Sequence, residues 1–146
     1  MKEDCCGARL PAIGDYGPNP LIVNIQCLAK QNPFFRTTLW TGTHMQLTLM
    51  SIPPQGEIGL EMHPDVDQFI RVEAGCGLVM MGESPETMYC RQAVEANLGV
   101  VIPAGTWHNL VNTGSAPLKL VSAYAPPQHP FGTVHKTKEE ADAAED

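Results

Sequence analysis

Short apolar runs alternate with turn-forming residues along most of the chain after residue 35. Within residues 44–52, apolar side chains fall on every second position from Met45 to Leu49, and polar ones lie between them. This period of two indicates a strand with one buried face. By the same reasoning we expect strands over residues 36–40, 44–52, 58–63, 68–73, 77–81, 88–93, 100–102, 107–112 and 118–124.

Gly and Pro residues stand between these predicted strands, as in segments 53–56, 64–67, 82–85 and 103–105. Such residues mark turns, and the middle of the chain shows no crossover helices of the kind that support a parallel sheet. Eight or nine short strands joined in this way predict an all-β fold, either a sandwich or a barrel.

The two ends of the chain differ from this strand-rich middle. Near the N-terminus a short helix is predicted over residues 25–31, which Asn24 would cap and Pro33 would end. Near the C-terminus, Thr137 and Glu140 resemble the capping box of a short helix. We therefore divide the chain into an N-terminal arm, a β-barrel, and a Pro-rich segment with an acidic helical tail: residues 1–35, 36–125 and 126–146.

Length and charge narrow the classes of partner. A chain of 146 residues has room for one domain of ordinary size. Its formal net charge of −7 argues against a nucleic acid or an anionic membrane as partner. The N-terminus is acidic where a signal peptide would be basic, and no apolar run approaches the ~20 residues of a membrane helix. We therefore expect a cytoplasmic protein that acts on a small molecule.

The cysteines are five in number and include no C-x-x-C pair: Cys5, Cys6, Cys27, Cys76 and Cys90. An odd set without such a pair is not typical of a disulfide framework or of a zinc site. We interpret all five as reduced thiols, in keeping with a cytoplasmic location.

Three polar residues around the predicted turn 64–67 indicate a site. If this turn closes a hairpin, His63 and Gln68 oppose each other on one face of the sheet. Glu61 lies two residues before His63 and therefore shares that face. A carboxylate, an imidazole and an amide oxygen would then converge inside the barrel. Either a divalent cation or a buried hydrogen-bond network would satisfy them.

A second segment adds another imidazole. The turn at residues 103–105 precedes a predicted strand in which His108 and Leu110 share the inward face. An inward His on a different hairpin is a natural fourth ligand to a metal held by Glu61, His63 and Gln68. Imidazole with carboxylate and amide oxygen suits Zn, Fe, Ni, Mn or Co better than Ca.

The first of these segments resembles the first motif of the cupin family. That motif has a His-x-His pair, a Glu a few residues later and then a Gly. Gly75 stands seven positions after Gln68, as the motif requires of its Glu, and His63 matches the second His. Glu61 replaces the first His, and Gln68 replaces the Glu. The chain thus departs from the usual three His and one Glu.

The second segment resembles the second cupin motif. Pro103, Gly105, His108 and Asn112 match it at the expected spacing, and Asn97 replaces its leading Gly. The two motifs together cover about residues 44–125. The whole chain is similar to a subgroup of small bacterial cupins labelled sugar-phosphate-isomerase-like.

The resemblance implies a double-stranded β-helix, or jelly-roll, that forms a homodimer. It implies one divalent transition metal held by Glu61, His63, Gln68 and His108, with Gln68 the most readily displaced. The metal would act as a Lewis acid on a sugar, sugar acid or keto/hydroxy acid in an isomerase or lyase step. Alternatives are an Fe(II)-dependent oxygenase and a non-catalytic module that binds or senses a small molecule.

Tyr124 and His129 are weaker candidates for catalytic residues, with His129 either a contact to the substrate or a group in proton transfer. Tyr124 ends the last predicted strand, and His129 follows it in the Pro-rich segment, which either packs on the barrel mouth as a structural tail or closes over the site. His135 flanks the same segment. Arg36 and Arg71 could bind an anionic substrate, but alternation places Arg71 on the face opposite Gln68, where a surface or interface role is expected.

Overall fold

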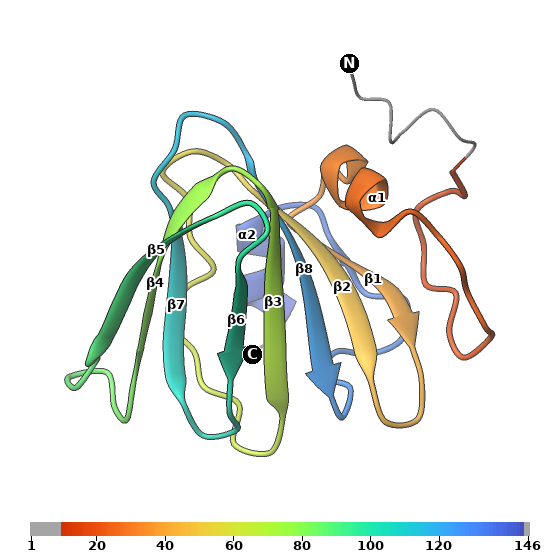
Figure 1. Cartoon of the computed structure of the whole chain (residues 1–146). Helices are drawn as coiled ribbons and strands as arrows, with labels where there is room; N and C mark the ends of the chain where they lie inside the picture. Colours follow the sequence, from red (N-terminus) through yellow and green to blue (C-terminus); the bar gives the residue numbers. More distant parts are fainter. Residues whose placement is uncertain (1–9, 145–146) are drawn as a thin grey trace.

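The computed structural model describes residues 10–144 and shows two antiparallel sheets that face each other (Figure 1). One sheet has six strands in the order β6-β3-β8-β2-β1-β9, and the other has three in the order β5-β4-β7. The predicted all-β double-stranded β-helix is confirmed.

Most elements follow one another with short connections, and the long segment 53–66 joins β2 to β3. The elements are α1 (Ile25–Gln31), β1 (Arg36–Thr41), β2 (Gln46–Ile52), β3 (Asp67–Ala74), β4 (Cys76–Gly82), β5 (Cys90–Glu95), β6 (Gly99–Ile102), β7 (Trp107–Asn112), β8 (Leu118–Ala125), β9 (Val134–His135) and α2 (Lys138–Ala144). Eight of the predicted strands are therefore confirmed within a few residues, whereas the short β9 was not predicted.

The strand predicted over residues 58–63 is wrong. This segment forms only isolated bridges to β7, between Glu57 and Val111 and between Glu61 and His108. Gly59 lies between the bridges with a φ of +104°, a backbone conformation outside the β region. Its N–H donates to the Asn109 side chain at 2.9 Å instead of to a strand backbone. The apolar alternation is present, but the ladder of a regular strand is not.

The inward faces of the strands change character along their length. Register places Val72, Leu120 and Met50 side by side across β3, β8 and β2, and all three belong to the apolar core. Two and four residues along the same strands, the aligned inward rows are Ile70, Ser122 and Thr48, then Gln68, Tyr124 and Gln46. The barrel therefore has an apolar end, which supplies the core, and a polar layer at its other end.

Helix α1 covers the outer face of the six-stranded sheet (Figure 1). Its buried Leu28 and Ala29 pack against outward side chains such as Leu49 and Val121. The Asn24 side chain accepts from the Cys27 N–H at 3.1 Å, so the predicted cap is confirmed. Helix formation here depends on this cap and on burial of an apolar face, since a seven-residue helix is too short to be stable alone.

The expectation that all five cysteines are reduced is wrong for Cys27, which is disulfide-bonded. Cys27 is fully buried on α1, and a count of cysteines does not reveal which of them are oxidised. Cys76 and Cys90 are free thiols. Cys5 and Cys6 lie outside the described residues, and the cytoplasmic location stays a prediction.

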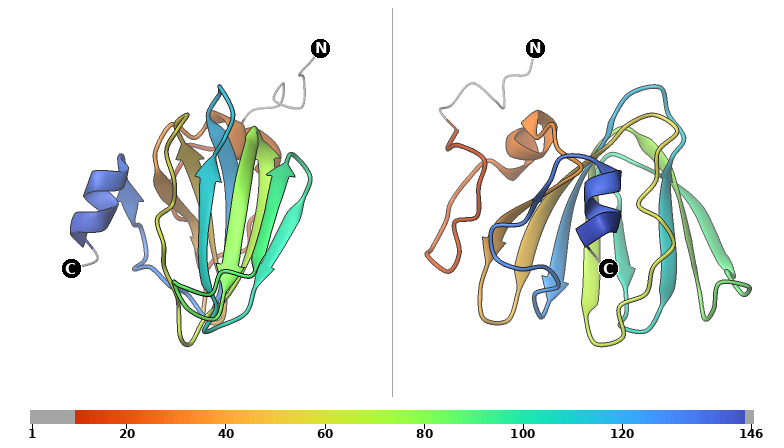
Figure 2. Two further views of the ribbon diagram at one scale, coloured as in Figure 1. Left: turned by 90° about the vertical axis from the view of Figure 1, so that its left-hand side faces the viewer. Right: turned by 180° about the vertical axis from the view of Figure 1, so that it is seen from behind.

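The C-terminal segment returns to the barrel and ends outside it (Figure 2). β9 pairs with β1, and Ala141 of α2 is buried against the core cluster. The Glu140 N–H donates to the Thr137 hydroxyl at 3.2 Å, and the Glu140 carboxylate accepts from the Lys136 N–H at 2.9 Å. The predicted capping residues thus start α2. Neither helix in the described part of the chain is long or apolar enough to span a membrane.

The outer face of the six-stranded sheet also carries exposed apolar residues away from α1. Phe69 on β3 and Val101 on β6 are cross-strand partners, 42% and 68% exposed. The homodimer predicted through an outer sheet face stays a prediction.

Asn112 joins the end of β7 to two neighbouring segments and provides a stability test. Its amide donates to the Ile52 and Ala116 carbonyls at 2.9 and 3.0 Å, and its oxygen accepts from the Gly114 N–H at 2.8 Å. The substitution Asn112→Ala leaves these groups unsatisfied and is expected to lower the free energy of unfolding by about 2–4 kcal/mol. Urea denaturation measures the change.

The matched control is Asn19→Ala, because the Asn19 side chain is exposed. Its free energy of unfolding should stay within about 0.5 kcal/mol of the parent value. Equal effects of the two substitutions would contradict the role assigned to Asn112.

Candidate metal centre

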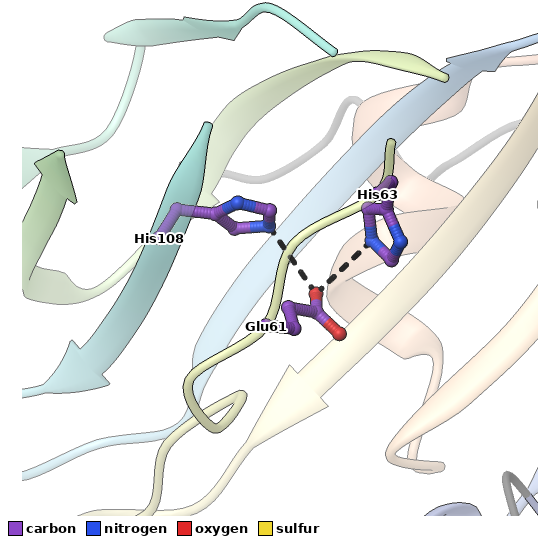
Figure 3. A group of neighbouring side chains, drawn as sticks. All are labelled: Glu61, His63 and His108. Carbon is purple, nitrogen blue, oxygen red and sulfur yellow. Dashed lines mark ion pairs between the residues drawn. The ribbon is translucent and has the colours of Figure 1, made fainter. Parts of the chain in front are cut away.

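Three side chains converge in the polar layer of the barrel (Figure 3). One ligand atom each from Glu61, His63 and His108 lies within 4.8 Å of the other two. Glu61 Oε2 is 3.5 Å from His63 Nε2 and 3.4 Å from His108 Nε2. We call these three residues the metal-ligand cluster.

The backbone brings this cluster together by a route that differs from the predicted hairpin. β3 pairs with β6 and β8, so His63 and Gln68 are not cross-strand partners. Instead Glu61 pairs with His108 through two backbone hydrogen bonds of 3.0 and 2.9 Å. The His63 carbonyl accepts from the Gly105 N–H at 2.8 Å, which holds His63 beside the turn before β7. The segment before β3 therefore adds to the three-stranded sheet and not to β3.

A neighbouring carbonyl orients the His108 imidazole. His108 Nδ1 lies 2.9 Å from the Thr106 carbonyl oxygen, which can only accept. Nδ1 therefore carries a hydrogen, and Nε2 is the ring nitrogen that faces Glu61. Metal-binding histidines are commonly oriented by this kind of second hydrogen bond.

The Glu61 carboxylate is ionised at neutral pH. Burial raises its pKa, but the interactions with His108 and His63 outweigh burial and lower the pKa to about 2. A carboxylate stabilised between two imidazole nitrogens supplies a negative charge to a cation at that position.

The unpartnered polar atoms fit a cation. In the part of the chain that the structure describes, His63 Nε2, His108 Nε2 and Gln68 Oε1 are buried and have no hydrogen-bond partner. Such atoms are costly unless something satisfies them. Ligand atoms about 2.1 Å from a metal in tetrahedral geometry lie roughly 3.4 Å apart, which matches the separations from Glu61. The donor set present therefore fits a transition-metal ion.

Gln68 lies in the same polar layer and is 2% exposed. Its Nε2 is 3.3 Å from the Tyr124 hydroxyl and 3.4 Å from the Ser122 hydroxyl, while its Oε1 lacks a partner among the described residues. The ring of Tyr124 lies 6.0 Å from the ring of His63. This arrangement leaves the amide oxygen available, and ligation by Gln68 stays a prediction.

Tyr124 and His129 extend the polar layer beyond the cluster. Their rings make an edge-on contact with centroids 5.3 Å apart. Burial raises the pKa of Tyr124 to about 12, so its hydroxyl keeps the proton. Burial, with a contribution from the Arg36 charge, lowers the pKa of His129 to about 3, so its imidazole is neutral.

The residue that positions His129 is Gln46, which the sequence analysis did not select. The fully buried Gln46 side chain accepts from the His129 N–H at 2.9 Å and donates to the His129 carbonyl at 2.8 Å. The available signal was a polar residue on the inward side of an alternating strand. The contact fixes the Pro-rich segment to β2.

The two arginines occupy different environments. Arg36 is 2% exposed, and its Nη1 lies 3.1 Å from His135 Nδ1. Arg71 is partly exposed and pairs with Glu73 at 2.5 Å on the outer face of β3. The surface role predicted for Arg71 agrees with this placement.

Comparison with known proteins identifies a matching protein family, two related sequences and a similar solved structure. Residues 48–124 match the cupin domain. The chain is 58% identical over 132 residues to the uncharacterized protein YrkC of Bacillus subtilis, covering 90% of this chain and 71% of YrkC. It is 38% identical to the uncharacterized protein L612 of Acanthamoeba polyphaga mimivirus, covering 77% and 69%. The crystal structure of BH2720 from Bacillus halodurans superposes with a TM-score of 0.89 at 55% identity, covering 90% and 99%.

The metal-ligand cluster can be tested by metal content. Protein loaded with Mn²⁺ or Zn²⁺ and then dialysed is expected to retain about one ion per chain, because carboxylate and imidazole ligands are both present. Glu61→Ala and His108→Ala should each lose most of that ion. Inductively coupled plasma mass spectrometry measures the ratio of metal to protein.

His44→Ala is the matched control, since His44 is exposed and outside the cluster. It should retain as much metal as the parent protein. Parent protein without metal, or cluster variants that keep a full equivalent, would contradict the assignment.

His129 predicts a pH dependence of stability. Its pKa is about 3 in the folded chain and near its ordinary value of 6.5 when unfolded, so below about 6.5 the unfolded state takes up a proton that the folded state does not. The stabilisation by neutral His129 is complete above that pH and declines as the pH falls toward 3. In His129→Gln the free energy of unfolding should therefore fall less steeply between these values.

Urea denaturation at a series of pH values measures both slopes. The control His44→Gln removes an exposed imidazole and should behave as the parent protein. A decline in His129→Gln as steep as in the parent protein would show that His129 does not contribute.

Proposed function

Because the chain belongs to the cupin domain family, we propose that it is a metal-dependent enzyme that acts on a small polar substrate by isomerase or lyase chemistry. The observation that carries this proposal is the metal-ligand cluster, a partly buried carboxylate between two imidazole nitrogens that lack hydrogen-bond partners within the described chain. A sugar, a sugar acid or a keto/hydroxy acid offers the oxygen atoms that such a centre would bind.

In this proposal the ligand residues have distinct roles. Glu61, His63 and His108 would hold a divalent ion of Zn, Mn, Ni, Fe or Co, with Gln68 as a neutral and readily displaced fourth ligand. When bound, the ion supplies Lewis acidity to a carbonyl or enediolate oxygen of the substrate. The single charge of Glu61 leaves the centre with a net positive charge, which favours an oxygen that becomes negative during reaction.

Tyr124 and His129 would contact the substrate beside the metal centre. With a pKa of about 12 the phenol acts as a hydrogen-bond donor at neutral pH. With a pKa of about 3 the imidazole is a weak base, which supports a role in hydrogen bonding and not in proton abstraction. Both groups are held by their neighbours, so they would orient a substrate without rearrangement.

One observation favours a second enzyme class. Two imidazoles and one carboxylate are the donor set of the non-haem Fe(II) oxygenases. An oxygenase needs Fe(II) and consumes oxygen, whereas an isomerase or lyase runs without oxygen. Oxygen-electrode measurements on iron-loaded protein separate the two classes.

The isomerase proposal predicts proton exchange next to a carbonyl. The protein is loaded with Mn²⁺, Zn²⁺, Ni²⁺ or Co²⁺ and incubated in D₂O without oxygen with a ketose or a keto acid. The substrate should then gain deuterium at the carbon beside its carbonyl group. Proton NMR of the substrate detects the exchange. His108→Ala should lose it, and His44→Ala should retain it.

The outcomes separate three functions. Exchange or product formation without oxygen supports the isomerase or lyase. Product formation only with iron and oxygen supports the oxygenase and contradicts the proposal. Saturable binding of metal and small molecule without any product supports a non-catalytic binding module.

A further inference from the structure

A second group of unpartnered polar atoms lies beside the metal-ligand cluster. Thr48 Oγ1 and His129 Nε2 are buried without a hydrogen-bond partner in the part of the chain that the structure describes. The side chain of Thr48 is fully buried on the inward face of β2, where it pairs across the sheet with Ser122. His129 is not among the residues whose ligand atoms come within 4.8 Å of one another. A single ion in the cluster therefore does not account for these atoms.

Tyr124 connects this second group to the cluster. Its ring lies 6.0 Å from the ring of His63 on one side and 5.3 Å from that of His129 on the other. Thr48 and Tyr124 lie on adjacent strands one inward row apart, and no hydrogen bond joins their hydroxyls. A small molecule with one end at the metal centre would therefore have its other end beside Thr48, Tyr124 and His129.

The chemistry of this group favours an anion. The hydroxyls of Thr48 and Tyr124 and the neutral imidazole of His129 can each donate one hydrogen bond, and none of the three carries a negative charge. The buried Arg36 guanidinium adds positive potential, since its charge acts on Tyr124 and His129 more strongly than the opposing charge of Glu61 does. Hydrogen bonds from such donors to a carboxylate are stronger than those to a neutral oxygen.

Resting on the proposed function, we infer that Thr48, Tyr124 and His129 form a subsite for the carboxylate of a small organic acid whose hydroxyl or carbonyl oxygen reaches the metal centre. This narrows the substrate class to keto acids, hydroxy acids and sugar acids. Neutral sugars and polyols would leave the donors with a weaker partner.

Gln46 holds this subsite in place before any ligand binds. Its side-chain amide bonds both backbone groups of His129, so the imidazole is positioned by a strand of the barrel and not by the loop alone. Thr48 and Tyr124 lie on adjacent strands, β2 and β8. A site that is built on rigid elements binds its ligand with little loss of conformational entropy.

Calorimetric titration tests the subsite with simple probes. Mn²⁺-loaded protein is titrated with glycerate and with glycerol, which share a carbon skeleton and differ in the carboxylate, and then with lactate and pyruvate. We expect the acids to bind and glycerol to bind much more weakly. Thr48→Val and Tyr124→Phe should each weaken binding of the acids by about tenfold or more, because each removes one donor to a charged group.

The matched control is Thr37→Val, which replaces another buried threonine. Its hydroxyl contacts Asn32 at 3.0 Å, away from the polar layer, so binding of the acids should not change. Acid binding as tight in Thr48→Val and Tyr124→Phe as in the parent protein would overturn the inference, as would glycerol binding as tightly as glycerate. No binding of the three acids up to millimolar concentration would also overturn it.

Metal content, measured on the same samples, separates this inference from the proposed function. One equivalent of metal with acid binding that is insensitive to both substitutions overturns the subsite alone. Protein that retains no metal overturns the proposed function. Titration of this metal-free protein with the acids then tests the subsite by itself. Weaker binding in Thr48→Val and Tyr124→Phe supports the subsite, and unchanged binding overturns it.

Discussion

The backbone pairing of Glu61 with His108 is the contact on which the arrangement of the site depends. It joins a segment without regular secondary structure to the edge of the three-stranded sheet, and it places a carboxylate and an imidazole beside each other in the barrel. The turn before β7 then positions His63 against the same carboxylate. Without this pairing the polar residues would remain on separate elements.

The apolar core of the barrel is separate from the polar layer in which this pairing lies. The apolar side chains of the strands gather toward one end and form the core, so folding does not require the polar end to be filled with hydrophobic groups. The polar layer is nevertheless buried, and several of its atoms have no partner within the described chain. A protein interior tolerates such atoms poorly, and the proposals of a metal ion and of an organic acid at this layer follow from that cost.

Sequence reasoning succeeded where local pattern decides the structure. Period-two alternation identified the strands that carry Gln68 and His108, and capping residues identified both helices. It failed where the path of a loop decides the pairing. The hairpin argument placed Glu61 with His63, but it chose β3 as the partner strand, because nothing local to residues 58–63 reveals an edge of β7. The role of Gln46 likewise depends on a distant segment, the one that carries His129.

The irregular segment before β3 has one more effect, which concerns self-association. The outer edge of β7 is already occupied, since its backbone bonds with Gly56, Ile58 and Glu61. The Asn109 side chain accepts from Gly59 and donates to Glu57 at 2.7 Å, so even the gap in this ladder is filled by side-chain bonds. A covered edge cannot template the addition of a strand from another molecule. The same segment that builds the site therefore also protects the three-stranded sheet from aggregation along β7.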